Sequence, residues 1–416
     1  MNTKNLTTAI LFAMILGAIL GGILNHFFMD YSFVSEFLVG NVFHVLGTIF
    51  VSSLKMLVVP LVFVSLVCGV AALGDINKLG RLGGKALLFY LVTTAIAITI
   101  ALTIATIVAP GQGFEIASAN TQSFTPKESP SLVDTIINLV PTNPINAMAK
   151  GEMLPLILFS LLFGIAIVMA GDAGKRIEQQ FNDYNAIIMQ LVMILMTLAP
   201  IGVFSLIAKT FALQGFDVIK PLLGYFLVVV SALMIHALII YPLLLKSFSG
   251  LSIRTFLRKM RSVQIFAFST ASSNATIPFN IENSEKKLGV DNSVASFTIP
   301  LGATINMDGT AIMQGVATVF IANVYGIDLG ITDYLLVILT ATLASIGTAG
   351  VPGVGLIMLA MVLNQVGLPV EGIALIIGVD RLLDMMRTAV NVTGDATATV
   401  IIAKSEGNLD KKIYNN

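Results

Sequence analysis

The chain has 416 residues, of which 56% are hydrophobic and 11% are charged, and its formal net charge is zero. An ordinary soluble domain carries about 25% charged residues, and a soluble core of this length does not bury so much apolar surface. The composition therefore predicts a membrane protein. It excludes the basic footprint of a nucleic-acid-binding protein, and the single Cys68 excludes a disulfide within the chain. His26, His44 and His236 share no ligand spacing, so no zinc-type centre is expected.

Six apolar segments are each long enough to cross a hydrocarbon core of about 30 Å. They span residues 7–24, 43–74, 84–109, 153–171, 187–213 and 219–245. A cleaved signal peptide is the alternative for the first, but its length and the lack of a small-residue cleavage site favour a retained span. Residues 111–150 are dominated by Gly, Pro, Ser, Thr and Asn, which predicts an extramembrane loop with short helical pieces.

Basic residues collect in alternate connections between these segments. The basic connections hold Lys4, Lys78, Arg81, Lys85, Lys175, Arg176 and the run 246–261, whereas the intervening ones carry mostly acids. Because Lys and Arg collect on the cytoplasmic side, we expect the amino terminus inside. Lys404, Lys411 and Lys412 place the carboxyl terminus inside as well. Two termini on one side require an even number of crossings, and eight fits the six segments plus two more.

Two segments in the last third are interrupted by polar centres rich in Gly, Pro or Ser. Residues 256–285 contain Ser-Thr-Ala-Ser-Ser-Asn-Ala-Thr at 269–276, and residues 334–366 contain Ser-Ile-Gly-Thr-Ala-Gly-Val-Pro-Gly at 345–353. Such centres cannot face lipid, since their backbone groups would be unsatisfied. Two kinked spans or two ordinary loops are the alternative. A pair of similar interrupted segments favours re-entrant hairpins that dip in from opposite sides and meet at the midplane.

The last apolar segment, residues 374–403, carries ionisable side chains at membrane depth, which are costly and functional by default. At about 100° per residue, a stripe within roughly 80° contains Asp380, Asp384, Arg387, Asn391 and Asp395, with Thr388 at its edge. The guanidinium of Arg387 matches a carboxylate, and Asp384 is placed to receive an ammonium. A salt bridge that only joins helices is the alternative, but it needs fewer groups. The stripe predicts a pocket for a zwitterion with an additional acid group.

A second polar group lies between the two interrupted segments, at residues 302–310. Asn306 and Asp308 are hard oxygen donors, and the flanking glycines permit local unwinding that frees carbonyls. Hard oxygens suit an alkali cation, and broken helices supply them in transporters. A kinked helix with a protonated, buried Asp308 is the alternative. Asp395 and Asn391 offer a second oxygen cluster.

Four motifs, in this order, resemble the glutamate/aspartate transporter family, the dicarboxylate/amino acid:cation symporters. They are the Ser-rich tip at 272–276 ending in Pro278, Asn-Met-Asp-Gly-Thr at 306–310, Gly-Thr-Ala-Gly-Val-Pro-Gly at 347–353, and Asp384-x-x-Arg387-Thr388-x-x-Asn391-x-x-x-Asp395. The resemblance covers nearly the whole chain. It implies an all-α multi-spanning membrane protein with eight transmembrane helices, two re-entrant helical hairpins and inverted repeats.

The resemblance also implies an elevator-type transporter, a homotrimer surrounded by membrane lipid in a bacterial plasma (inner) membrane. Residues 1–80 and 111–215 would form a scaffold, with an extracellular loop in the latter. Residues 81–110 and 216–416 would form a mobile transport domain, including hairpin 1 (256–285) and hairpin 2 (334–366). Its function would be uptake of L-aspartate and/or L-glutamate coupled to a Na⁺ gradient, with more than one ion.

By match to the family pattern, Arg387 would hold the substrate side-chain carboxylate and Asp384 its amino group. The other substrate-binding residues would be Ser272, Ser273, Thr310, Val351, Gly355, Thr388 and Asn391. One Na⁺ site would use Gly302, Asn306, Asn391 and Asp395. A second would use carbonyls near Thr304, Ser345, Ile346 and Thr348. A third would use Tyr90, Thr93, Thr94, Asn306 and Asp308, of which the first three would alone be ordinary helix–helix hydrogen-bonding residues.

The sequence departs from the family pattern at three positions. Archaeal members carry an Arg at the first hairpin tip and animal members one after the Asp of the last helix, whereas Ala271 and Met385 stand here. The balance between aspartate and glutamate therefore stays open. The Glu that carries a proton in animal members is matched by Gln314, so proton cotransport through it is not expected. The related C4-dicarboxylate carriers lack an acid equivalent to Asp384, and neutral-amino-acid relatives replace the key Arg, here Arg387.

Two other classes of protein were alternatives. An intramembrane aspartic protease could use Asp308 and Asp395, but such a dyad shares one proton, and Arg387 and Asn391 favour the ionised form. A pure ion channel could build a filter from polar hairpins, but it leaves the pairing of Arg387 with Asp384 without a purpose. We therefore expect a carrier and not an enzyme. A proton-coupled or C4-dicarboxylate carrier of the same family is the remaining alternative.

Overall fold

A computed structural model describes residues 3–71, 80–114, 137, 140–346, 348, 350 and 352–415. Within this part of the chain the regular structure is helical, apart from an isolated bridge between Val290 and Leu409. The elements are α1 (Thr3–Phe27), η1 (Phe33–Phe43), α2 (His44–Ala71), α3 (Gly80–Val108), α5 (Pro144–Lys150), α6 (Met153–Met169), α7 (Asp172–Met196), α8 (Ala199–Gln214), η2 (Gly215–Val218), α9 (Ile219–Ile235), η3 (His236–Ile240), α10 (Tyr241–Ser249), α11 (Ile253–Thr270), α12 (Ser273–Lys286), α13 (Asn292–Ile305), α14 (Asp308–Val324), α15 (Ile331–Ser345), α16 (Val354–Gln365), η4 (Val370–Gly372), α17 (Ile373–Glu406) and α18 (Lys411–Asn415).

The all-helical class is confirmed, and the apolar helices suit a multi-pass membrane protein. Among the described residues, four helical runs are long and apolar enough to cross a bilayer, namely Thr8–Phe27, Phe33–Ala71, Leu82–Val108 and Ala199–Ser249. Shorter apolar helices include Pro155–Met169, Ile331–Ser345 and Val354–Gln365. The number of eight crossings stays a prediction.

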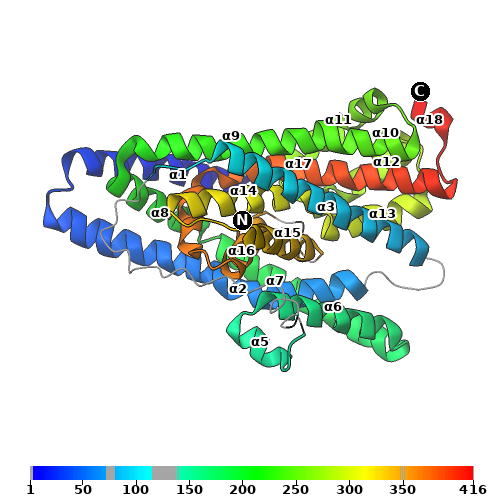
Figure 1. The fold of residues 1–416 in the computed structure, drawn as a ribbon, viewed down its shortest axis with the longest axis horizontal. Helices are drawn as coiled ribbons and strands as arrows, with labels where there is room; N and C mark the ends of the chain where they lie inside the picture. The colour runs from blue at the N-terminus through cyan, green and yellow to red at the C-terminus, as the bar shows by residue number, and fades with distance from the viewer. Residues whose placement is uncertain are drawn as a thin grey trace.

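The helices pack in two groups. In one, α1 packs on α8, and α2 packs on α6, α7 and α8. In the other, α17 packs on α9, α10, α11, α13 and α14, and α3 packs on α14. Figure 1 shows α9 and α10 along one long side of the molecule and α5 and α6 along the other, with α14 between them. The long helix α17 belongs to the second group and runs toward the end where α18 lies.

Small residues bring α1 and α8 close together. A Cβ atom at Gly17 would lie 2.8 Å from the carbonyl oxygen of Phe204, and one at Gly21 would overlap the carbonyl oxygen of Ala208. Two small residues four apart let helix backbones approach closely in a membrane. A side chain at either glycine would therefore push α1 away from α8.

The predicted span 187–213 was wrong in one respect, because it is not a single helix. The first part ends with α7 at Met196, and α8 begins at Ala199. Pro200 lies in the first turn of α8. Its ring nitrogen has no hydrogen to donate to the carbonyl of Met196, so a continuous α-helix loses a bond there. The predicted span 43–74 also begins earlier, since the helical run starts at Phe33.

The loop predicted over 111–150 is described only in part, and there it contains a short helix as expected. Asn143 caps α5, because its side-chain oxygen accepts from the backbone N–H of Ile145 at 3.0 Å and of Asn146 at 3.1 Å.

The two interrupted segments are pairs of helices that pack on each other, α11 with α12 and α15 with α16. Ala271 ends α11 in the left-handed region with φ 49°. The two tips meet, since the carbonyl oxygen of Gly350 accepts from the Ser272 hydroxyl at 2.7 Å and from the Asn274 backbone N–H at 3.1 Å. The structure thus shows two helix pairs whose tips meet, whereas re-entrant hairpins that enter from opposite sides of a membrane and meet at its midplane stay a prediction.

Candidate functional site

The polar stripe lies on α17, which runs without interruption from Ile373 to Glu406. Its five members are buried, with exposed fractions of 5% for Asp380, 8% for Asp384, 1% for Arg387, 3% for Asn391 and 1% for Asp395. Charged side chains avoid both lipid and a dry core unless they are paired. The stripe therefore faces protein, as its periodicity predicts.

Arg387 lies between two carboxylates of its own helix. Its Nη2 donates to Asp384 Oδ1 at 2.9 Å, and its Nη1 lies 3.0 Å from Asp380 Oδ1 in an ion pair without hydrogen-bond geometry. The Nε of Arg387 has no hydrogen-bond partner among the described residues. The second oxygen of Asp384 accepts weakly from Arg381 Nη1 at 3.4 Å and from the Gly353 backbone N–H at 3.3 Å. The guanidinium keeps donors that its own helix does not use.

A small polar cavity opens beside this arginine, between the hairpin tips, α14 and α17. It is lined by Ala271, Ser273, Met307, Thr310, Thr348, Gly350, Gly355, Asp384, Thr388 and Asn391. The structure thus brings together most of the residues predicted to bind substrate, namely Ser273, Thr310, Gly355, Asp384, Thr388 and Asn391. Three predicted residues do not line this cavity. Arg387 reaches it only through its bond to Asp384. Ser272 caps α12 through its bond from the Ala275 N–H, and Val351 lies outside the described residues.

Gly355 sets the distance between the second hairpin and the arginine. A Cβ atom at this position would lie 3.3 Å from Arg387 Nη1, Met313 Cε and Thr310 Cγ2. Such contacts are tighter than ordinary van der Waals distances, so a larger residue would displace the guanidinium or the hairpin. Gly355, which lines the cavity, therefore keeps room for the guanidinium of Arg387.

The predicted unwinding at residues 302–310 occurs between α13 and α14. Asn306 and Met307 leave the helical conformation there. The Asn306 side-chain nitrogen donates to the Asn391 carbonyl at 3.0 Å and to Asp395 Oδ1 at 2.9 Å. Its Oδ1 is buried and has no hydrogen-bond partner in the part of the chain that the structure describes. An orphaned acceptor beside a carboxylate is a place where a cation would be favourable.

Asp308 is the first residue of α14, and its side chain is completely buried. Its Oδ1 accepts from Thr94 Oγ1 at 2.6 Å. Its Oδ2 accepts from Tyr241 Oη at 2.8 Å and lies 2.9 Å from His236 Nε2. Thr94 and Asp308 of the predicted third cation group are therefore in direct contact.

Tyr90 lies at the edge of the same region. The Tyr90 hydroxyl donates to the Thr298 carbonyl at 3.0 Å. A Cβ atom placed at Gly302 would lie 2.8 Å from the same Tyr90 Oη. That Cβ would also lie 2.5 Å from Asp395 Oδ1. Thr93 instead donates to the carbonyl of Tyr90 at 3.1 Å. Tyr90, Gly302 and Asp395 are thus neighbours, and the first and third predicted cation groups adjoin.

The second predicted cation group is less closely assembled. The hydroxyls of Thr304, Ser345 and Thr348 each donate to a carbonyl in their own segment, at 2.8, 2.7 and 2.8 Å. The approach of hairpin 2 to α13 is seen instead at Gly350, where a Cβ would lie 2.9 Å from the Ala303 carbonyl oxygen. Ile346 turns its carbonyl toward α2, at 3.0 Å from a Cβ placed at Gly69.

The donor chemistry of this region fits alkali cations. Asp308 and Asp395 are 0% and 1% exposed, and neither forms an ion pair with a Lys or Arg among the described residues. Buried carboxylates need a compensating charge. The described residues contain no cluster of three or more His, Cys, Asp or Glu side chains that could hold a metal. The available oxygens are carboxylate, amide, hydroxyl and carbonyl groups, which are hard donors.

Two residues of this region were not expected from the sequence, His236 and Tyr241. The three histidines share no ligand spacing, and a regular α-helix would place His236 and Tyr241 on different faces. Asp380 was recognised as part of the stripe, but its ion pair with Arg387 was not.

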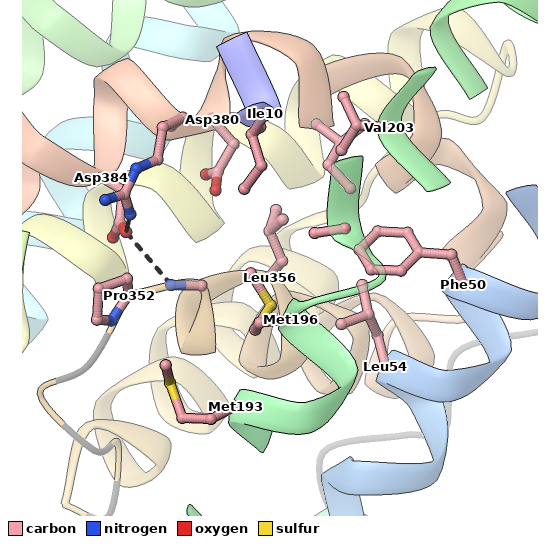
Figure 2. A pocket seen from close by; sticks show the side chains of 14 residues that line it. Ile10, Phe50, Leu54, Met193, Met196, Val203, Pro352, Leu356, Asp380 and Asp384 are labelled. Atoms are coloured by element: carbon pink, nitrogen blue, oxygen red, sulfur yellow. Dashed lines mark hydrogen bonds and ion pairs between the residues drawn. The ribbon is translucent and has the colours of Figure 1, made fainter. Parts of the chain in front are cut away.

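A larger, mainly apolar cavity adjoins the polar one. Figure 2 shows Phe50 and Leu54 of α2 and Val203 of α8 on one side of it and Pro352 and Asp384 on the other, with Leu356 beside Met196 between them and Ile10 beside Asp380. The dashed line marks the bond from the Gly353 N–H to Asp384. Asp384 lines both cavities. The first helix group therefore meets hairpin 2 and α17 across an apolar surface next to the polar site.

Comparison with known proteins adds the following. A family model described as the sodium:dicarboxylate symporter family matches residues 6–405. The proton/glutamate-aspartate symporter of Escherichia coli (strain K12) is 39% identical over 418 residues, covering 98% of this chain and 94% of that protein. The proton/sodium-glutamate symport protein of Geobacillus stearothermophilus is 36% identical, covering 99% and 97%. The C4-dicarboxylate transport protein of Bacillus subtilis (strain 168) is 34% identical, covering 98% and 95%.

Proposed function

Since the chain belongs to the sodium:dicarboxylate symporter family, we propose that it takes up acidic amino acids, L-aspartate and/or L-glutamate, coupled to a Na⁺ gradient. Family membership makes the chain a transporter and not an enzyme, so the aspartic protease alternative is rejected. The observation that carries the substrate proposal is the buried Arg387, held between Asp380 and Asp384, because Asp384 itself lines the polar cavity.

The substrate would bind by exchanging partners with this arginine. A substrate carboxylate would replace Asp380 or Asp384 at the guanidinium, whose fork of donors accepts a carboxylate in a bidentate way. Asp384 would then be free to accept the substrate ammonium. Thr310, Thr388 and Asn391 would supply the remaining polar contacts in the cavity. A C4-dicarboxylate has no ammonium and would leave Asp384 with only its long contacts to Arg381 and the Gly353 N–H, which is costly in a buried site.

Two or more Na⁺ ions would bind at the broken helix α13–α14. The unpartnered Oδ1 of Asn306 and the buried carboxylates of Asp308 and Asp395 support this proposal. Relatives are named for proton coupling or for proton and sodium coupling. Coupling to protons alone is therefore the second candidate, and the transport experiment below includes it.

The transport step would be a movement of the second helix group past the first, as in an elevator. The packing of α1, α2 and α6–α8 on one another, and of α3, α9–α11, α13 and α14 around α17, supports the proposed division into a scaffold (1–80, 111–215) and a transport domain (81–110, 216–416). The surface between the two helix groups, at the cavity shown in Figure 2, is mainly apolar and contains Met193, Met196 and Leu356. Flexible, apolar side chains without directional bonds suit a sliding surface. We further propose a homotrimer in the inner membrane with both termini in the cytoplasm.

Uptake into proteoliposomes tests the substrate and the coupling ion together. We expect labelled aspartate and glutamate to accumulate when Na⁺ is higher outside, and succinate to compete weakly. Accumulation driven by a proton gradient without Na⁺ would contradict Na⁺ coupling. Preferential accumulation of succinate would contradict the amino-acid assignment, and flux without accumulation would favour a channel.

A reversible cross-link tests the sliding movement. In a chain whose single cysteine is removed by Cys68→Ala, Ile207→Cys and Gly378→Cys would link α8 to α17, because a Cβ at Gly378 would lie 2.7 Å from Ile207 Cδ1. We expect oxidation to reduce uptake about tenfold or more and a reductant to restore it, because the two groups could no longer separate. The matched control is Val70→Cys with Gly164→Cys, which links α2 to α6 within one group. Full uptake in the cross-linked α8–α17 variant would contradict the elevator.

A further inference from the structure

The helical run from Ile219 to Ser249 contains a π-helical stretch, η3, between α9 and α10. The backbone N–H of Tyr241 donates to the carbonyl of His236, which is the i→i+5 bond of a π turn. On an α-helix, residues five apart lie about 140° apart around the axis. The wider π turn brings them to one face. Such π-bulges are frequent at functional sites. We therefore examine what His236 and Tyr241, the two side chains that this π turn aligns, contact.

Both side chains reach the same atom. Tyr241 Oη donates to Asp308 Oδ2 at 2.8 Å, and His236 Nε2 lies 2.9 Å from it. The two rings touch edge to face, with centroids 4.5 Å apart. A carboxylate that binds Na⁺ is ionised and only accepts, so in such a site Nε2 would carry the hydrogen. His236 Nδ1 has no hydrogen-bond partner among the described residues.

The other carboxylate oxygen points to a different helix. Asp308 Oδ1 accepts from Thr94 Oγ1 of α3 at 2.6 Å. Thr94 belongs to the third predicted cation group, together with Tyr90 and Thr93. Two donors on Oδ2 thus fix the carboxylate so that Oδ1 faces α3. Without these two hydrogen bonds the Asp308 carboxylate could rotate, because the χ2 torsion of Asp has no narrow preferred value. Its Oδ1 would then no longer face α3.

We propose that His236 and Tyr241 are positioning residues that hold Asp308 for Na⁺ and thereby set the affinity of the chain for Na⁺. This inference rests on the proposed Na⁺ coupling and names two residues that the predicted cation groups do not contain. The π turn is the structural reason that both donors reach one oxygen. A purely structural role is the competing explanation, in which the two bonds only satisfy buried polar groups.

Three variants separate these explanations. Tyr241→Phe removes one hydroxyl, His236→Leu removes the imidazole donor, and His236→Gln keeps a donor at a similar reach. The matched control is Tyr225→Phe on α9, because Tyr225 is equally buried and its hydroxyl has no hydrogen-bond partner among the described residues. The full-length protein in detergent would be titrated with NaCl, with choline chloride as the salt control, and its thermal unfolding followed. Uptake of labelled aspartate would give the Na⁺ dependence and the aspartate KM.

We expect Tyr241→Phe and His236→Leu to raise the Na⁺ concentration for half-maximal stabilisation about tenfold, because each loses a hydrogen bond to a charged group. His236→Gln should be closer to the unaltered chain, and Tyr225→Phe should match it. The aspartate KM at saturating Na⁺ should not change. If His236→Leu does not fold, Tyr241→Phe decides, since it removes a single oxygen atom.

Lower stability in choline with an unchanged Na⁺ midpoint would overturn the inference, and so would equal shifts in the Na⁺ midpoint and the aspartate KM. If the unaltered chain shows neither Na⁺-dependent stabilisation nor Na⁺-dependent uptake, the proposed Na⁺ coupling itself is wrong and the inference falls with it. That result is distinguishable, because it appears before any variant is compared.

Discussion

The helix α17 contributes to two buried charge clusters, which are built differently. In the first, Arg387 lies 3.0 Å from Asp380 and 2.9 Å from Asp384. In the second, Asp395 and Asp308 lie among amide, hydroxyl and imidazole groups, with no Lys or Arg in the described part of the chain as an ion-pair partner. A cluster with its own guanidinium can exchange an internal carboxylate for that of a substrate. A cluster of carboxylates alone gains most from an added cation. This contrast is why we assign the anion to the first cluster and Na⁺ to the second.

Asn391 connects the two clusters. Its side chain lines the polar cavity, and its Oδ1 accepts from the Gly309 N–H at 2.7 Å. Its backbone carbonyl accepts from Asn306 at 3.0 Å. A cation that reorients Asn306 would therefore move a group that touches Asn391. We expect substrate and Na⁺ to bind cooperatively through this residue, and cooperative binding is reciprocal by linkage.

The largest effect that would separate the clusters is expected from Arg387→Ala. Aspartate uptake should fall about a hundredfold or more, because truncating one partner of a buried charge pair costs several kcal/mol. Na⁺-dependent thermal stabilisation should persist, since the second cluster is untouched. Arg258→Ala, at an exposed position of α11, is the control. Undiminished aspartate uptake in Arg387→Ala would contradict the assignment of the substrate site.

The reciprocal change is Asp395→Asn, which keeps the shape of the side chain and removes its charge. We expect the Na⁺ concentration for half-maximal uptake to rise about tenfold or more, because a cation loses a charged ligand in a buried site. Aspartate binding at saturating Na⁺ should change less. Asp328→Asn, at an exposed position after α14, is the control. An unchanged Na⁺ dependence would show that the second cluster does not bind the coupling ion.

Asp384→Asn sharpens the comparison within the first cluster. It removes the carboxylate that would receive the substrate ammonium, so the KM for aspartate should rise about tenfold. Succinate has no ammonium, and its inhibition of uptake should weaken less or become stronger. The ratio of the two inhibition constants is the measurement. Equal weakening for aspartate and succinate would mean that Asp384 only orients Arg387.

Much of this arrangement could be predicted from the sequence, because it depends on local periodicity. The stripe from Asp380 to Asp395 follows from the 3.6-residue repeat, and the break at Asn306 follows from glycines beside polar residues. The helical hairpins follow from polar centres that cannot face lipid. Residues 115–136 and Val351, which the predictions also used, lie outside the described part of the chain.

The contacts that were not predicted depend on tertiary packing. His236 and Tyr241 lie in the apolar run 219–245, and the π turn between them aligns both with Asp308 of a distant helix. A polar pair five residues apart in an apolar helix was the available signal, but the α-helical period hides it. The break between α7 and α8 was also missed, although Pro200 marks it, because the apolar composition continues across Thr197 and Leu198.

The smallest expected effect concerns Asp380, the part of the first cluster that the sequence left without a role. Asp380 would compete with a substrate carboxylate for the same guanidinium, because Arg387 Nη1 already lies 3.0 Å from Asp380 Oδ1. Asp380→Asn weakens this internal competitor while Asp384 still pairs with the arginine. The KM for aspartate should therefore fall about threefold, and the maximal rate should fall with it because the substrate leaves more slowly. Equilibrium exchange of labelled for unlabelled aspartate measures both. A higher KM would mean that Asp380 holds Arg387 in its binding position and does not compete with the substrate.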